Sequence, residues 1–174
     1  MKKIWFASIA LVAMTGLVHA DGALARSGDA AANAQIQQLV DTFQAAIIAK
    51  DGARLDSLFL PDSAWLSVYE DDTYRLLKAK HPGASKLLPD SHRKFTDFVS
   101  VSPKPLEEKF SNLRIDTDGT VGTVYFEYAF FRDGKQTNDG HETWQLVNTD
   151  AGWKISAMLY SVRLDPSILR QTRN

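Results

Sequence analysis

The residues best suited to chemistry are two glutamates and a tyrosine in the last third of the chain, Glu142, Glu127 and Tyr125. Two neighbouring carboxyl groups push their pKa values apart, so that one keeps a proton while the other accepts one. A phenol can donate to an oxygen that gains negative charge. Glu142 as base and Tyr125 as donor would therefore suit acid–base catalysis next to a carbonyl. The alternative is that Glu142 pairs with an arginine such as Arg114 or Arg163, or lies at the hydrated edge of the sheet.

Other kinds of site lack the residues they need. The 174-residue chain has no cysteine, which excludes disulfide frameworks, thiolate metal sites and cysteine nucleophiles. We expect no metal, because His81, His92 and His141 lack the spacing of ligands, and we interpret His81 and His92 as solvated. We also expect no cofactor, since no phosphate loop or dinucleotide motif is present. The formal net charge of -1 argues against a nucleic-acid partner.

Four predicted strands position the candidate residues. They are divided by short turns that favour hairpins, and they cover residues 107–117, 120–132, 135–149 and 152–164. A two-residue turn at Asp133-Gly134 pairs Tyr125 with Glu142. The turn that ends at Gly152 then pairs Glu142 with Leu159.

This register divides the sheet into two faces. The inner face, together with aromatic residues from the preceding segments, is predicted to line a pocket with Trp65, Tyr69, Phe95, Glu127, Trp144 and Leu159. The opposite face is aromatic, no helix remains to cover it, and it carries Phe126, Tyr128, Phe130, Met158 and Tyr160. We predict that this outer face pairs with a second copy of the chain, which makes the protein a homodimer.

Helices precede these strands. Apolar residues recur three and four positions apart from Ile36 to Ile47, which predicts one long amphipathic helix that ends near Gly52. Shorter helical patterns cover residues 53–60, 74–78 and 91–101, and residues 63–70 alternate as a strand does. The basic residues between 78 and 94 are interpreted as a solvated lid. Helices followed by strands are typical of an α+β domain.

The first 20 residues have the pattern of a secretory signal. A basic start precedes an apolar run over residues 4–18, and small residues allow cleavage after Ala20, with a competing site after Ala25. The run is shorter than the roughly 20 residues that span a bilayer. We expect a flexible mature N-terminus over residues 21–32, one domain over 33–164 and a tail over 165–174. The mature protein would be exported, most simply to a bacterial periplasm, without a membrane anchor.

Several motifs resemble those of a known superfamily. They are the helical run 36–59 with its Lys50-Asp51-Gly52 turn, the strand Gly140-His141-Glu142-Thr143-Trp144-Gln145-Leu146-Val147, and Gly152-Trp153-Lys154-Ile155. Together they resemble the nuclear transport factor 2-like superfamily, and within it the exported SnoaL-like or ketosteroid isomerase-like branch. The resemblance implies a cystatin-like α+β roll, in which a curved antiparallel sheet wraps round a long N-terminal helix. The open end of this cone is a pocket, and the family commonly forms dimers through its sheets.

Three functions are compatible with this pocket. The first is binding of a small, largely apolar molecule. The second is an acid–base enzyme of the isomerase, dehydratase or cyclase type, with Glu142 and Tyr125 as catalytic residues. The third is a dimeric interaction module whose pocket is filled by its own side chains.

Overall fold

The computed structural model describes residues 27–171, so the predicted signal peptide lies outside the described residues. Five helices lie in this range: α1 Ser27–Ala49, α2 Gly52–Asp56, α3 Asp71–Lys80, α4 His92–Val101 and α5 Pro166–Gln171. The strands are β1 Phe59–Tyr69, β2 Leu87–Pro89, β3 Leu106–Thr117, β4 Val121–Arg132, β5 Lys135–Thr149 and β6 Gly152–Leu164. None of the helices in this part of the chain combines the length and the apolar character that crossing a membrane requires.

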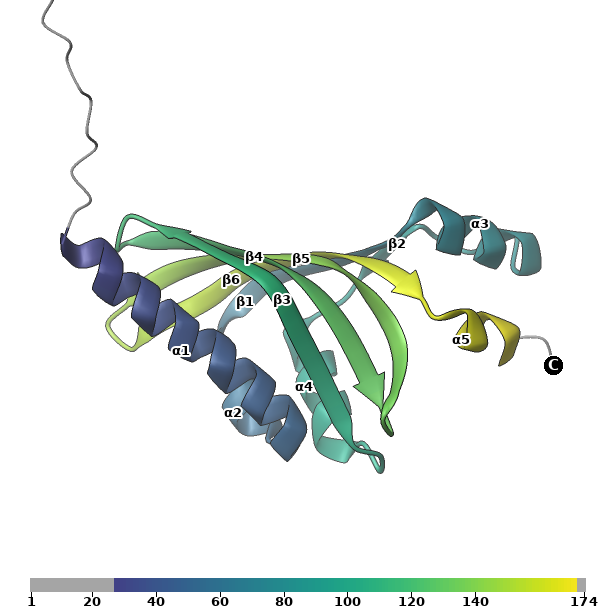
Figure 1. The fold of residues 1–174 in the computed structure, drawn as a ribbon, viewed down its shortest axis with the longest axis horizontal. Helices are drawn as coiled ribbons and strands as arrows, with labels where there is room; N and C mark the ends of the chain where they lie inside the picture. Colours follow the sequence, from purple (N-terminus) through teal and green to yellow (C-terminus); the bar gives the residue numbers. More distant parts are fainter. Residues whose placement is uncertain (1–26, 172–174) are drawn as a thin grey trace, which may run out of the picture.

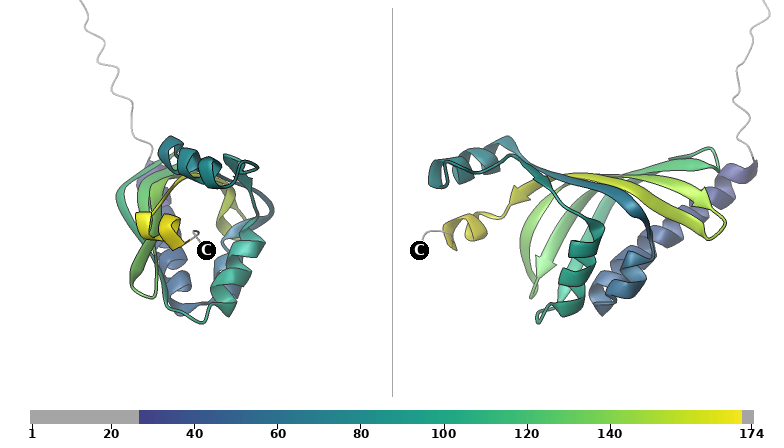
Figure 2. Two further views of the ribbon diagram at one scale, coloured as in Figure 1. Left: turned by 90° about the vertical axis from the view of Figure 1, so that its right-hand side faces the viewer. Right: turned by 180° about the vertical axis from the view of Figure 1, so that it is seen from behind.

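One curved sheet of six strands forms the frame, in the order β2-β1-β6-β5-β4-β3 (Figure 1). The predicted meander β3 to β6 is antiparallel throughout, and β1 pairs with β6 in parallel. The sheet is therefore mixed, not wholly antiparallel as expected. α1 runs along the concave side, and α4 closes the same side beside it (Figures 1 and 2). The α+β fold class is confirmed.

The apolar stripe of α1 forms the centre of the core, as predicted. Ile36, Val40, Phe43 and Ile47 are fully buried. The ring of Phe43 lies 4.8 Å from that of Trp144, which joins the helix to the middle of the sheet. This burial stabilises the helix more than the helix propensity of its sequence does.

The helix ends at a residue other than the predicted glycine. Lys50 takes the left-handed conformation, with φ 58°, and the Asp51 N–H donates to the Ala46 carbonyl at 2.9 Å. Gly52 serves close packing instead, because a Cβ there would collide with Ser100 and with the carbonyl of Thr96. α2 and α4 can approach each other only with glycine at this position.

Two β-bulges set which residues face the core. Asp133 and Gly134 form the expected two-residue turn, with positive φ angles of 56° and 72°, and Arg132 pairs with Lys135. The register then shifts at Thr137, so that Phe126, and not Tyr125, pairs with Glu142. A second shift at Ser156 pairs Glu142 with Tyr160 instead of Leu159. Each extra residue reverses the faces of the strands beyond it.

The bulges overturn the predicted faces of the sheet. Phe126, Tyr128 and Met158 lie inside the protomer and are almost fully buried, and Phe130 and Tyr160 pack against the same core. They are therefore not an outer surface available for a partner. Because this expectation rested on the register, the prediction of a homodimer loses its surface, and dimerisation itself stays a prediction.

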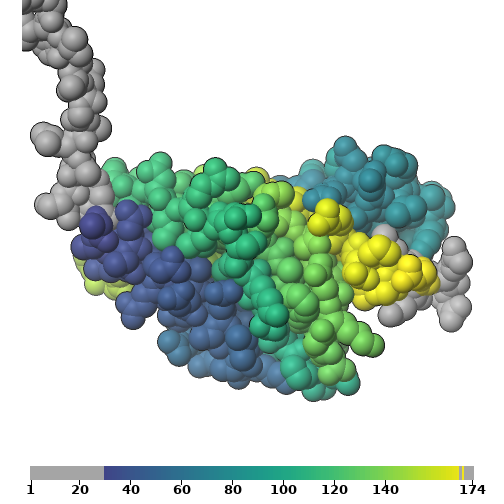
Figure 3. Space-filling view, in the orientation of Figure 1, coloured from purple at the N-terminus to yellow at the C-terminus, as the bar shows by residue number. Residues whose placement is uncertain are grey.

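The ends of the domain and of β1 differ from the predicted boundaries. α1 begins at Ser27, so residues 27–32 are helical where a flexible segment was expected. The predicted tail contains α5, which lies at the end of the molecule near α3 (Figure 3). β1 starts at Phe59 and continues through Pro61, because the register break between Phe59 and Ala64 requires no ladder hydrogen bond from the proline.

Candidate functional site

A cavity of about 380 Å³ lies between the sheet and the helices. Its wall is largely aromatic and comes from α1, β1, α4, β4 and β6: Phe43, Trp65, Phe95, Phe98, Tyr128, Phe130 and Tyr160. Met158 and Ile168 add aliphatic surface. The left view of Figure 2 shows these elements arranged in a ring, with α5 at its open end. The size and the apolar wall are typical of a small-molecule site.

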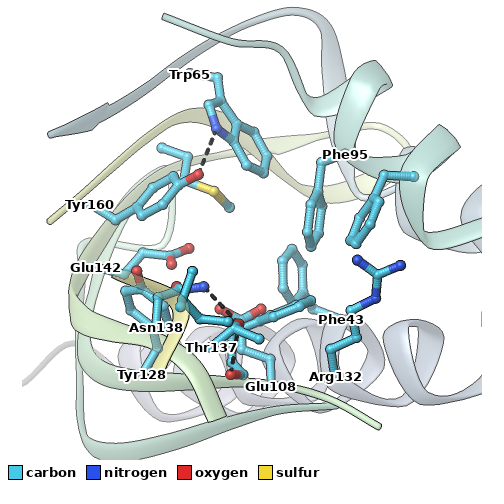
Figure 4. Close-up of a pocket in the computed structure, with 14 residues that line it drawn as sticks. Phe43, Trp65, Phe95, Glu108, Tyr128, Arg132, Thr137, Asn138, Glu142 and Tyr160 are labelled. Atoms are coloured by element: carbon cyan, nitrogen blue, oxygen red, sulfur yellow. Dashed lines mark hydrogen bonds between the residues drawn. The ribbon is translucent and has the colours of Figure 1, made fainter. Parts of the chain in front are cut away.

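Two buried carboxyl groups interrupt the aromatic wall. Glu108 on β3 and Glu142 on β5 are 6% and 3% exposed. In Figure 4 Glu142 lies between Tyr160 and Tyr128, and Trp65 and Phe95 lie across the cavity from Glu108. The remaining polar wall consists of Arg132, Thr137 and Asn138. Burial of two acids is costly unless they are hydrogen-bonded, protonated or paired with a cation.

Within residues 27–171, the carboxyl of Glu142 has one hydrogen-bond donor. The indole Nε1 of Trp144, two residues along the same strand face, donates to its Oε1 at 2.5 Å. Burial raises the pKa of Glu142 to about 8, although the Trp144 hydrogen bond opposes the rise by favouring the ionised form. Near neutral pH, Glu142 can therefore both hold and release a proton.

Glu108 is also held in its protonated form. Burial, followed by the negative charge of Glu142, raises its pKa well above the usual value. Gln44 of α1 donates to its backbone carbonyl at 2.8 Å, which fixes the strand against the helix. Among residues 27–171, no hydrogen bond or ion pair engages its carboxyl group. Its side chain can therefore donate or accept in the cavity.

Two tyrosines complete the polar lining and differ in what their protons do. The Tyr128 hydroxyl donates to the Ser161 carbonyl at 2.9 Å, so its proton is already engaged. The Tyr160 oxygen accepts from the Trp65 indole at 3.3 Å and also interacts with the Ser67 hydroxyl, and neither contact commits its proton to a backbone carbonyl. Burial raises the pKa of Tyr160 to about 12 and keeps that of Tyr128 higher still. Both phenols stay protonated, and Tyr160 is the better donor to a bound molecule.

Comparisons with known proteins address the fold. No protein-family model matches the sequence, and no curated protein matches it. Solved structures do match. One is a protein from Novosphingobium aromaticivorans described as NTF2-like with a cystatin-like fold: TM-score 0.58, 12% identity, covering 83% of this chain and 90% of the other. The fold is that of the nuclear transport factor 2-like proteins.

Two further solved structures share this nuclear transport factor 2-like fold. A protein of unknown function from Shewanella baltica has a TM-score of 0.56 and 14% identity, covering 78% of this chain and 97% of the other. A candidate scytalone dehydratase from Novosphingobium aromaticivorans has a TM-score of 0.56 and 15% identity, covering 78% and 86%. Identities this low establish the fold and leave the activity open.

The cavity contains part of the predicted site. Glu142, Trp65 and Phe95 line it, whereas Trp144 is not among the lining residues and donates a hydrogen bond to Glu142. Tyr69 is on β1 but is not among the lining residues.

The other predicted residues lie on the outer face of the sheet. Tyr125 packs there against the Arg114 guanidinium and the His141 ring, at 4.9 and 5.8 Å. Glu127 lies 3.7 Å from His141. Leu159 is 51% exposed. These corrections all follow from the two bulges, which reverse the faces of the strands.

The alternative ion pairs of Glu142 are absent from the described residues. Arg163 pairs with Asp139 at 2.7 Å, and Arg114 stacks on Tyr125. His92, expected to be solvated, is buried against Phe59 and links Ser63 at 2.7 Å to Asp56 at 3.3 Å. No group of residues suited to hold a metal ion occurs in the range that the structure describes.

Glu108 is the main functional residue that sequence reasoning missed. A signal was present, because Leu106, Glu108 and Phe110 alternate along β3 and place the glutamate between two apolar residues on one face. Tyr160 and Tyr128 were identified but assigned to the outer face. An acid on an apolar strand face is a signal that could have identified Glu108, whereas the two tyrosines were misplaced by the bulges.

Proposed function

We propose that the protein binds a small, largely apolar molecule in this cavity, with Glu108 and Glu142 contacting a polar group of that molecule. The observation that carries the proposal is the combination of about 380 Å³ of aromatic-walled space with two buried carboxyl groups that line it. The wall would contribute most of the binding free energy, and the carboxyls would orient the ligand. A purely structural module would not require buried acids at this position.

Binding is tested with a neutral fluorescent probe and two neighbouring substitutions. N-phenyl-1-naphthylamine should bind the purified protein with a saturable rise in fluorescence. Met158 lines the cavity and Leu159 faces solvent, so Met158→Phe should weaken probe binding about tenfold while Leu159→Phe leaves it unchanged. Equal effects of the two substitutions, in variants that unfold at the wild-type temperature, would contradict the proposal.

Acid–base catalysis next to a carbonyl is a second candidate, and the pKa of Glu142 favours it. A base that titrates near neutral pH, a protonated carboxylic acid and a phenol are the groups that stabilise an enolate in one apolar site. Glu142 would take the proton from carbon. Glu108 or Tyr160 would donate to the carbonyl oxygen, in place of the Tyr125 that the sequence suggested.

Hydrogen–deuterium exchange at the carbon next to the carbonyl of 2-tetralone tests this candidate. We expect protein-dependent exchange in D2O that Glu142→Gln abolishes and Tyr160→Phe lowers. Glu127→Gln removes a charge from the outer face and is the matched control. Exchange that survives in Glu142→Gln would assign the proton transfer elsewhere.

Export remains part of the proposal and rests on residues 1–20. The intact mass of protein recovered from the periplasm of an expressing bacterium should equal that of residues 21–174. A full-length mass in the cytoplasm would contradict export. Light scattering on the same material tests the homodimer, and a monomer at micromolar concentration would exclude it.

A further inference from the structure

We infer that the ligand of the cavity is an organic cation, in which an ammonium group is attached to an apolar skeleton. This inference rests on the proposed small-molecule binding and specifies its chemical class. It is drawn from the cavity wall and from what surrounds the two acids.

The two buried acids lack a cation beside them. Glu108 and Glu142 line one cavity, and Arg132 is the single cation among the lining residues that the structure describes. Arg132 lies exposed, with its guanidinium 5.9 Å from the ring centroid of Phe98. Arg163 and Lys104 pair with Asp139 and Asp133 instead. A bound ammonium ion would therefore supply a charge that the protein does not place beside its buried acids.

The carboxyl of Glu108 lacks a partner among the described residues. Glu108 is only 6% exposed and lines the cavity. Within residues 27–171, no hydrogen bond or ion pair engages its side chain. A neutral hydrocarbon would cover the carboxyl without offering it a partner, which is costly for a polar group. An ammonium ion would offer a partner to both carboxyls.

Aromatic side chains form the wall of the cavity. Trp65, Phe95 and Tyr160 face the cavity, with Trp65 and Tyr160 edge to face at 90°. Aromatic faces attract cations, tryptophan most strongly, and walls of this kind recognise quaternary ammonium ligands. Carboxyls on one side and ring faces on the other match the two needs of a hydrophobic ammonium ion.

Binding of a cation would draw protons off the two acids. The ionisable groups that line the cavity are Glu108 from β3, Tyr128 and Arg132 from β4, Glu142 from β5 and Tyr160 from β6. Burial raises the pKa of all the acidic ones, so they are held protonated in the free protein. Cation affinity should therefore rise with pH as the glutamates ionise, and each binding event near pH 7 should release protons.

Two probes of equal shape isolate the charge. Phenyltrimethylammonium and tert-butylbenzene differ in one central atom and in charge, and ligand-observed NMR titration gives a dissociation constant for each. At pH 8.5 the cation should bind at least tenfold more tightly than its neutral isostere. At pH 5, where both glutamates hold their protons, the preference should fall toward one.

Three substitutions test whether the two glutamates cause the preference for the cation. Glu108→Gln and Glu142→Gln preserve shape and remove ionisation, so each should reduce the cation preference about fivefold or more at pH 8.5. Glu127→Gln removes the same charge from the outer face and should retain the full preference. If a variant fails to unfold cooperatively, the pH series on the wild-type protein stands as the test.

The outcomes separate the two proposals. Equal binding of both probes at pH 8.5, or tighter binding of tert-butylbenzene, would overturn the cation inference and leave small-molecule binding intact. Absence of binding by both probes and by N-phenyl-1-naphthylamine would overturn both. A cation preference that survives in Glu108→Gln and in Glu142→Gln would also overturn the inference.

Discussion

At the scale of single residues, the two buried glutamates should control how stability depends on pH. Their pKa values are raised above 4.5, the ordinary value, and that of Glu142 reaches about 8. Between these limits the folded state holds protons that the unfolded chain has lost. The contribution of these bound protons to the free energy of unfolding is complete below about pH 4.5, and it is lost as the pH rises through 8.

We expect the free energy of unfolding to fall between pH 6.5 and 8, by up to about 1.4 kcal/mol per pH unit for each group. Urea unfolding at a series of pH values measures this slope. The double variant Glu108→Gln/Glu142→Gln should have a flatter profile. A flat wild-type profile over this range would show that both acids are already ionised in the folded protein.

Trp144 should tune the acidity of Glu142. Its indole N–H stabilises the carboxylate, so Trp144→Phe should raise the pKa of Glu142 further, on the order of one unit. ¹³C NMR titration of labelled glutamate carboxyls measures the change. Trp144 is fully buried beside Phe43, so the smaller phenylalanine leaves a void, and thermal unfolding verifies that the variant is folded before the titration. An unchanged titration would mean that the hydrogen bond does not favour the ionised form.

At the scale of elements, the sequence predicted the helices and strands better than it predicted their faces. The α1 stripe, the α4 span and the Asp133-Gly134 turn could be predicted because each depends on local spacing or turn chemistry. The bulges could not, because Thr137 and Ser156 do not differ from ordinary strand residues. Their hydroxyls donate to Phe130 and Gln145 carbonyls on the paired strands, contacts that exist only after pairing.

Gly140 should be required for β5 and β6 to lie together. A Cβ there would collide with the Ser161 carbonyl, the same group that accepts from Tyr128. Gly140→Ala should lower the free energy of unfolding by about 1–3 kcal/mol, as overpacked positions do. Gly83→Ala is the control, since that position is open. Equal denaturation midpoints for the two variants would contradict this role.

His92 should make α4 sensitive to acid. Burial lowers its pKa below 6.5, although Asp56 partly opposes this, so protonation is harder in the folded state than in the unfolded one. Its contribution to stability is complete above about pH 6.5 and is lost as pH falls. His92→Gln should remove this acid-side slope in urea unfolding from pH 6.5 to 5. A steeper slope in the variant would contradict the assignment.

At the scale of the whole molecule, α5 should control escape from the cavity. Ile168 of this short helix contributes to the wall at the open end of the cone. Ile168→Ala should speed probe release several-fold with little change in the unfolding midpoint. Val101→Ala, at an apolar position that is 78% exposed, is the control. Stopped-flow fluorescence measures both rates, and equal rates would assign the exit elsewhere.

Because of the two bulges, the loss of a single codon could change which side chains of a strand face the cavity. Removal of the single codon for Thr137 would exchange inside and outside along the strand beyond it, bringing Tyr125 opposite Glu142 in place of Phe126. A substitution in the cavity wall would alter one side chain, whereas this deletion would change every residue that the shifted strand contributes to the wall. Relatives of this protein should therefore be aligned by the face each strand presents, because an alignment by residue count alone would compare a cavity wall with a solvent-facing surface.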